Sequence, residues 1–173
     1  MTFHRPVLAA TIYVALVTGA AAETKLTEFN GEWRGSGQER DSPLQYLQAT
    51  SCRNVIRASP KRMQSEMTCE RKSGGSKLIR MTVMLEGDEL TGRITRRAMQ
   101  PGREDAVIRG TVSGKTTDKS ANLLVRWQGA TPNTAVDLKL NTATSYSMQA
   151  TALGMTMMDL TLNRLAERAP PRR

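Results

Sequence analysis

The sequence predicts an all-β fold, in which an antiparallel up-and-down meander of about 8–10 strands closes into a lipocalin-like barrel. Apolar and polar residues alternate with a period of two through most of the chain after residue 28. Turn residues, mainly glycine, proline, asparagine and aspartate, recur at nearly even spacing between these runs. No segment shows a convincing amphipathic helix. A mature chain of about 150 residues builds one modest hydrophobic core, so we expect one domain.

Residues 1–22 are expected to form an export signal. Arg5 precedes a short apolar run, and Ala20-Ala21-Ala22 supplies the small residues of a cleavage site. The run is too short for an ordinary membrane span, and no later segment is apolar enough to be one. The sequence therefore predicts a periplasmic protein that does not span the membrane. It consists of a barrel domain over residues 23–165 and a disordered basic tail over residues 166–173.

The first strand is expected over residues 29–37, with Phe29 and Trp33 on its apolar face. A hairpin that contains both cysteines is expected to follow the first strand. The later strands are expected near residues 79–85, 90–95, 106–112, 121–127, 136–140, 146–150 and 158–164. Turns between them are expected at residues 86–88, 114–118, 129–133 and 141–144 and at Gly154.

Cys52 and Cys69 are the only two cysteines, and export places them where disulfides persist. In an antiparallel hairpin, opposed residues have position numbers with a constant sum, which is 121 for this pair. The same sum centres the turn on Pro60-Lys61, where proline is favoured because its ring fixes φ. The sequence thus predicts strands near residues 46–58 and 62–71 with a disulfide bond between them.

Gly31-Glu32-Trp33 matches the G-x-W motif of lipocalin-like, or calycin, barrels, and Arg164 stands near the end of the last expected strand. In that family the tryptophan plugs one end of the barrel and the arginine packs across it. The resemblance therefore implies this structural role for Trp33 and Arg164. The stretch from Phe29 to Gly37 also resembles the start of small exported alphaproteobacterial proteins of unknown function. Avidin-like and protease-inhibitor barrels begin similarly, so the resemblance selects no ligand.

The mature chain has no histidine, because the single histidine is His4. This excludes Ser-His-Asp and Cys-His catalysis and histidine-ligated zinc. Ser36 lies between glycines but not in a nucleophile elbow, and no EF-hand or phosphate-loop spacing occurs. We expect no catalytic residue, no metal and no cofactor. A carboxylate-dependent hydrolase stays open as an alternative, because two carboxylates about 5–10 Å apart would suffice.

Nine methionines follow the signal, in a chain with few aromatic residues. They must supply much of the interior volume, and we expect them to fill an ordinary core. An adaptable apolar cavity lined by methionine is the alternative.

The formal net charge is +9, and removal of the signal with its one arginine leaves +8. Arg93, Arg96 and Arg97 are expected to project from the polar face of the middle strands and to attract anionic lipid or acidic envelope polymers. Nucleic acid is not expected as a partner, because the basic residues lack interleaved aromatic side chains.

These observations predict an exported, non-catalytic binding or envelope-associated barrel. Its ligand is either a small apolar molecule inside the barrel or an anionic partner on the basic face. A periplasmic protease-inhibitor-type barrel, acting through an exposed terminus or loop, is the first alternative.

Overall fold

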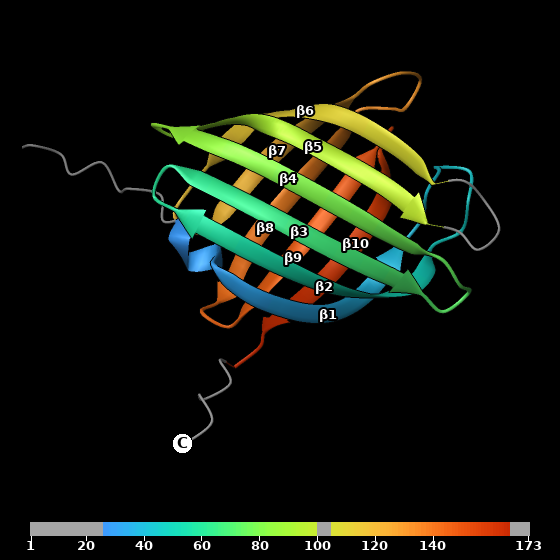
Figure 1. The fold of residues 1–173 in the computed structure, drawn as a ribbon, viewed down its shortest axis with the longest axis horizontal. Coiled ribbons are helices and arrows are strands. Elements are labelled where there is room, and N and C mark those ends of the chain that lie inside the picture. Colours follow the sequence, from blue (N-terminus) through green and yellow to red (C-terminus); the bar gives the residue numbers. More distant parts are fainter. Residues whose placement is uncertain (1–25, 100–104, 167–173) are drawn as a thin grey trace, which may run out of the picture.

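The computed structural model describes residues 26–99 and 105–166, which form one closed β-barrel (Figure 1). Ten antiparallel strands follow one another around the barrel in chain order, and the last pairs with the first to close it. The all-β meander expected from the sequence is confirmed. The expected export signal over residues 1–22 lies outside the described residues, as does the expected tail beyond Ala166.

The strands begin after a short 3-10 helix, η1 (Leu26–Phe29), and most of them extend a few residues beyond the predicted bounds. They are β1 (Gly31–Glu39), β2 (Gln48–Ser59), β3 (Arg62–Arg71), β4 (Ser76–Glu86), β5 (Glu89–Met99), β6 (Ala106–Thr116), β7 (Ser120–Trp127), β8 (Thr134–Thr142), β9 (Ser145–Ala152) and β10 (Met155–Arg164).

The β2–β3 hairpin has the register that the two cysteines predict. Cys52 is paired with Cys69, and Ala58 is paired with Met63 near the turn. Both pairs have the sum of 121. The strands end at Ser59 and begin again at Arg62, which leaves Pro60 and Lys61 as the two turn residues.

Phe29 was expected in the first strand, and this expectation is wrong. Phe29 ends η1, whose backbone closes with a hydrogen bond from the Asn30 amide to the Thr27 carbonyl. The chain then enters β1 through Gly31, whose φ of 135° is a conformation that favours glycine. The Phe29 side chain is buried and packs edge-on against the Tyr146 ring, with ring centres 6.0 Å apart.

The turn expected at residues 114–118 begins later, because β6 continues to Thr116. Gly114 is a strand residue that is paired with Leu123 of β7. A Cβ atom at this position would overlap the carbonyl oxygen of Asn122. Glycine at this position permits a close approach of two neighbouring strands. Glycine within a strand can therefore mark such a close approach as well as a turn.

Alternate residues of every strand point into the barrel and form a single buried cluster. The two ends of the barrel differ (Figure 1). We call the end that carries η1 and the β2–β3 turn the closed end. We call the opposite end, which carries the loop over residues 40–47 and the β7–β8 loop, the open end.

Candidate ligand-binding cavity

Trp33 and Arg164 lie together at the closed end. Trp33 is fully buried, and its indole Nε1 donates a hydrogen bond of 2.8 Å to the Phe29 carbonyl oxygen. Arg164 is directly paired with Trp33 in the β1–β10 register, and its guanidinium carbon lies 4.6 Å from the centre of the indole ring. Arg164 also donates a hydrogen bond to the Glu28 carbonyl oxygen. These contacts hold η1 across the end of the barrel and seal it.

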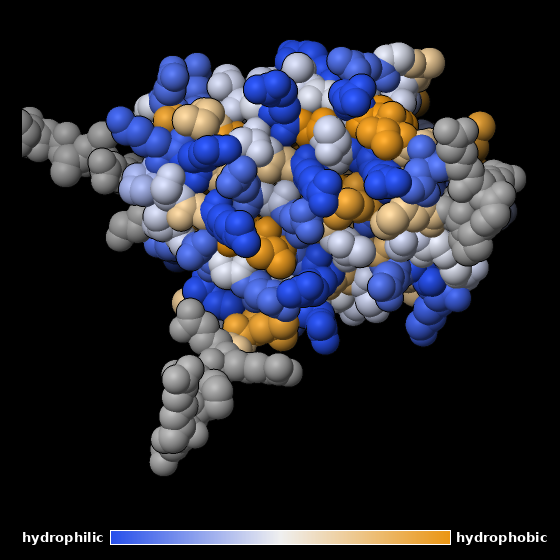
Figure 2. Space-filling model, in the orientation of Figure 1, coloured by the Kyte–Doolittle hydropathy of each residue, from blue (hydrophilic) through white to orange (hydrophobic). Residues whose placement is uncertain are grey.

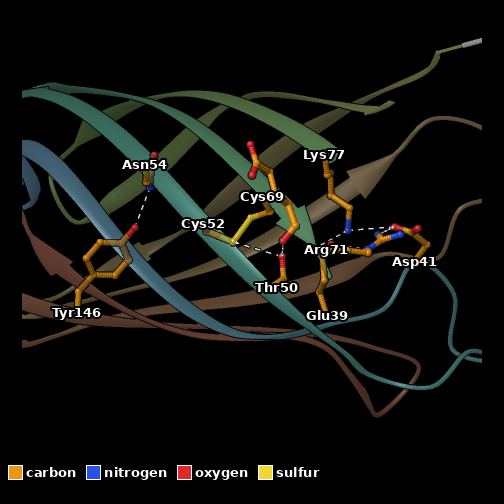
Figure 3. The surroundings of a disulfide bond; sticks show 10 residues. Glu39, Asp41, Thr50, Cys52, Asn54, Cys69, Arg71, Lys77 and Tyr146 are labelled. Atoms are coloured by element: carbon orange, nitrogen blue, oxygen red, sulfur yellow. Dashed lines mark hydrogen bonds and ion pairs between the residues drawn. A yellow bond between two sulfur atoms is a disulfide. The ribbon is translucent and has the colours of Figure 1, made fainter. Parts of the chain in front are cut away.

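A chain of buried polar groups lies just inside this seal. The ring of Tyr146 packs edge-on against Trp33, with ring centres 4.9 Å apart. Asn54 donates a 2.8 Å hydrogen bond to the Tyr146 hydroxyl (Figure 3). It also accepts a 2.8 Å hydrogen bond from the Ser65 hydroxyl. Burial raises the pKa of Tyr146 to about 12, although the hydrogen bond from Asn54 opposes the shift. The phenol therefore stays neutral and fixes the Asn54 amide.

The disulfide bond between Cys52 and Cys69 is confirmed and lies at mid-height on the inner face of the barrel (Figure 3). Both cysteines are buried, and their Cα atoms are 4.1 Å apart. Next to the bond, the Thr50 hydroxyl donates a 3.0 Å hydrogen bond to the Glu70 carbonyl oxygen. The disulfide bond and this hydrogen bond fasten β2 to β3 between the closed end and the charged groups of the open end.

Four charged residues form a largely buried cluster near the open end, which we call the ion-pair cluster: Glu39, Asp41, Arg71 and Lys77 (Figure 3). Glu39 is fully buried and accepts hydrogen bonds of 2.7 Å from Arg71 and 2.9 Å from Lys77. Asp41 also contacts both bases, at 2.6 and 3.0 Å. Two acids and two bases thus neutralise one another.

The bases of the ion-pair cluster fix the ionisation of Asp41. Burial disfavours the charged carboxylate, but the hydrogen bonds and positive charges of Arg71 and Lys77 outweigh this effect. Together they lower the pKa of Asp41 to about 2. Asp41 is therefore an anion throughout the physiological pH range.

The ion-pair cluster was not among the predicted sites, although the alternation of residues along the strands carries a signal for it. Glu39 has the same parity as Trp33, which lies on the inner face of β1. Lys77 likewise has the parity of Ile79 and Met81 on the inner face of β4. A charged residue that continues an apolar parity points toward the interior and needs a partner there.

A cavity of about 120 Å³ occupies the interior between the Tyr146 hydrogen bonds and the open end. Its wall is mostly apolar, and methionine is the commonest residue in it: Met63, Met67, Met81, Met148, Met157 and Met158. Several of these side chains also belong to the buried core. The methionines therefore fill the interior only in part, and both of their expected roles are present.

The size of the cavity limits what it can hold. An apolar cavity of about 150 Å³ in another protein accommodates benzene, whereas sites for drug-sized ligands run from about 300 to 1,000 Å³. A space of about 120 Å³ fits a body of roughly six carbon atoms. Flexible thioether side chains in the wall can move to admit a somewhat larger body.

The open end is bordered by loops. Arg40, Asp41 and Pro43 line the cavity from the loop over residues 40–47, and Thr131 and Pro132 line it from the β7–β8 loop. The Arg40 amide donates a 2.8 Å hydrogen bond to the carbonyl oxygen of Met157 in β10. The start of the first loop is thereby held against the last strand at the mouth of the cavity.

The expectation that Arg93, Arg96 and Arg97 share one outer face is wrong for Arg96. Strand residues alternate between faces, so Arg96 lies on the face opposite to its two companions. It has the parity of Ile94 and lines the cavity, with its guanidinium carbon 5.5 Å from the ring centre of Trp127.

Arg93 and Arg97 point outward. Arg97 donates a 2.8 Å hydrogen bond to the Asp105 carboxylate, which neutralises its charge on the surface. Arg93 is exposed and, within residues 26–99 and 105–166, forms no ion pair. Only Arg93 of the three expected residues thus offers an unmatched charge on the outer face.

Over the described ranges, no helix is long and apolar enough to cross a membrane. In the same part of the chain, no group of three or more histidine, cysteine, aspartate or glutamate side chains is placed to hold a metal ion. No model of a protein family matches the sequence, and no curated protein matches it. The fold and the cavity define a closed ten-stranded antiparallel barrel that is consistent with the lipocalin-like architecture.

Proposed function

We propose that this protein is a non-catalytic binding barrel that takes a small apolar ligand into its methionine-lined cavity. The cavity itself is the observation that carries the proposal. An interior space that is bordered by loops at one end and sealed by Trp33 at the other has the form of a ligand site with one entrance.

The wall of the cavity is suited to binding by shape and apolar contact. Strand β3, which the disulfide bond links to β2, supplies Met63 and Met67 from a fixed backbone, and the methionine side chains supply adaptability. Burial of an apolar body in such a site gives a negative heat-capacity change.

The charged groups at the cavity support binding over hydrolysis. A carboxylate-dependent hydrolase needs one carboxyl group that holds a proton near neutral pH. Asp41 is ionised because its pKa is lowered to about 2 by Arg71 and Lys77, and Glu39 is bonded to the same two bases. In the proposed role, Glu39 and Asp41 hold Arg71 and Lys77 in place.

Calorimetry with a small apolar compound such as benzene tests the proposal. Ala150→Leu places a larger side chain in the cavity wall and should abolish binding. Thr151→Leu adds the same side chain at the next residue of β9, where it faces away from the cavity, and should leave binding unchanged. If Ala150→Leu binds as well as the unsubstituted protein, the ligand does not occupy this cavity.

We further propose that the protein is exported to the periplasm, as in the small alphaproteobacterial proteins that its N-terminal strand resembles. The disulfide bond supports an oxidising compartment. Mass spectrometry of the protein from cell fractions should find a periplasmic chain that begins at Glu23. Recovery of the full-length chain from the cytoplasm would contradict this.

A second candidate function is attachment to anionic envelope lipid or polymer through the outer face. Arg57 and Arg93 belong to one row across the sheet, in which they are linked in register by Gln64 and Thr82. In the described part of the chain neither arginine forms an ion pair. Figure 2 shows this side of the barrel, with hydrophilic residues spread over it.

Cosedimentation with anionic and neutral vesicles tests this second function. Binding to anionic vesicles should weaken steeply with salt, because such attraction is screened over about 8–10 Å at ordinary ionic strength. Replacement of Arg57 and Arg93 together by glutamine should weaken it at constant salt. Equal binding to neutral vesicles, or none at low salt, would remove this candidate.

A further inference from the structure

Arg96 occupies an unusual position for a charged side chain. On the inner face of β5 it follows Ile94, and its cross-strand neighbours are Ile79 in β4 and Ile108 in β6. The side chain is half-buried and lines the cavity at the open end. A guanidinium group has five N–H donors and keeps its charge in proteins.

Among the residues that the structure describes, Arg96 has one strong contact. Its guanidinium lies over the ring of Trp127, whose own Nε1 is held by a 3.0 Å hydrogen bond to the Thr134 hydroxyl. Within residues 26–99 and 105–166, no carboxylate lies in ion-pair range of Arg96 and no oxygen accepts a hydrogen bond from it. Burial lowers the pKa of Arg96, and the charges of Asp41 and Glu39 oppose this shift only in part.

Asp41 and Glu39 compensate the charge of Arg96 only in part, because both are already paired with other bases. Glu39 and Asp41 are each bonded to both bases of the ion-pair cluster, which is neutral as a whole. The charge of Arg96 is therefore in excess at the mouth, and so is that of Arg40, whose acceptors among the described residues are backbone carbonyl oxygens. An anion placed beside it would meet a fixed guanidinium in a partly desolvated site.

A second arginine at the mouth has an unused donor. Arg40 lines the same cavity and donates from one terminal nitrogen to the carbonyl oxygens of Pro43 and Gln45. Its Nε is buried and, among the described residues, has no hydrogen-bond partner. A buried donor without a partner is costly, so an acceptor supplied by a ligand would be stabilised there.

From these observations we propose that the cavity binds a short amphiphile with one oxyanion head, a carboxylate in the simplest case. The head lies at Arg96 beside Trp127, and the apolar tail of about six carbons extends between the methionines. This inference rests on the proposed function, because it names the ligand class of the same cavity. The neutral ion-pair cluster and the unmatched charge of Arg96 together favour an anionic head over a neutral one.

Hexanoate and 1-hexanol are the probes, because they share a six-carbon skeleton and differ in the charge of the head. Calorimetry on the mature protein should show at least tenfold tighter binding of hexanoate. Arg96→Gln should weaken hexanoate by about 10- to 100-fold, the range for loss of charge-assisted hydrogen bonds, and leave hexanol unchanged. Arg96→Lys keeps the positive charge but lacks the planar guanidinium group, and it should weaken hexanoate binding less than Arg96→Gln does.

Arg93→Gln is the matched control, since it removes an arginine from the outer face of the same strand. It should change neither affinity. A thermal unfolding curve for each variant shows whether it is folded. If Arg96→Gln is not folded, Arg96→Lys is compared with the unsubstituted protein instead. Hexanoate should also change the fluorescence of Trp127, and the change should vanish in Trp127→Phe.

The outcomes separate this inference from the proposed function. Equal binding of hexanol and hexanoate, with Arg96→Gln without effect, overturns the anionic head and leaves the apolar cavity standing. If Arg93→Gln weakens hexanoate binding as much as Arg96→Gln does, the attraction is a general effect of the surface charge. That result also overturns the anionic head group at Arg96. If neither probe binds and benzene does not bind, the proposed function fails with it.

Discussion

Replacement of Trp33 by alanine removes the residue that closes one end of the barrel. The indole is fully buried, packs against the ring of Tyr146 at 4.9 Å, and is covered by the Arg164 guanidinium at 4.6 Å. Its Nε1 also anchors η1 through the Phe29 carbonyl. The substitution should therefore loosen η1 and open the closed end to water.

The magnitude follows from what the buried ring contributes. A buried aromatic side chain removes about 150–250 Å² from water, which at about 25 cal/mol per Å² is an upper estimate of roughly 4–6 kcal/mol. Large aromatic-to-alanine changes in protein cores cost about 3–5 kcal/mol. We expect Trp33→Ala to lower the free energy of unfolding by about 3–5 kcal/mol, which is a large share of the stability of an ordinary domain.

Urea denaturation followed by circular dichroism measures this change. The midpoint should fall while the slope stays nearly constant, provided that the barrel remains two-state. Trp127→Ala is the control, because Trp127 is partly exposed at the open end and should cost clearly less. A loss below about 1 kcal/mol for Trp33→Ala would refute the closure of the barrel by this residue and would leave the all-β fold intact.

Three further predictions concern the groups that fasten the barrel wall. Mass spectrometry should find Cys52 and Cys69 oxidised in one peptide pair, and the double alanine variant should lose about 3 kcal/mol; free thiols would contradict the bond. Glu39→Gln removes a partner of Arg71 and Lys77 and should lower the free energy of unfolding by about 3–5 kcal/mol. Glu66→Gln breaks an exposed ion pair and should lower it by less than about 1 kcal/mol. Equal losses in the two variants would contradict the burial of the cluster. The pKa of Asp41 is about 2 in the folded protein, below its ordinary value of 3.8, so its contribution to stability is present above pH 3.8 and is lost between pH 3.8 and 2. Asp41→Asn should reduce the pH dependence of the urea midpoint between these two values. An unchanged pH dependence would refute the pairing.

The strand order of the barrel could be predicted because local sequence patterns determine it. The register of the β2–β3 hairpin followed from the positions of Cys52 and Cys69 and from the turn preference of Pro60. A strand period of two is strict, so each apolar run also indicated which residues face inward. Gly114 misled the turn prediction, because a glycine at a close approach of strands and a glycine in a turn look alike in one sequence.

The candidate site was predictable only in part. Parity alone places Arg96 inside the barrel, yet its basic neighbours suggested a common outer face. The partners of Glu39 and Lys77 lie on different strands, and the sequence gives no distance between them until the sheet is closed. The volume left among the methionines depends on the packing of all ten strands, so no local pattern reports it.

The central claim is that an apolar ligand occupies the methionine-lined interior. The most direct measurement is a titration with benzene of protein labelled with ¹³C at the methionine methyl groups. We predict saturable shifts for the interior methyls of Met63, Met67 and Met148, and none for Met84, which is exposed on the outer face of β4. Interior signals that stay unchanged at saturating benzene, or shifts confined to Met84, would contradict the claim.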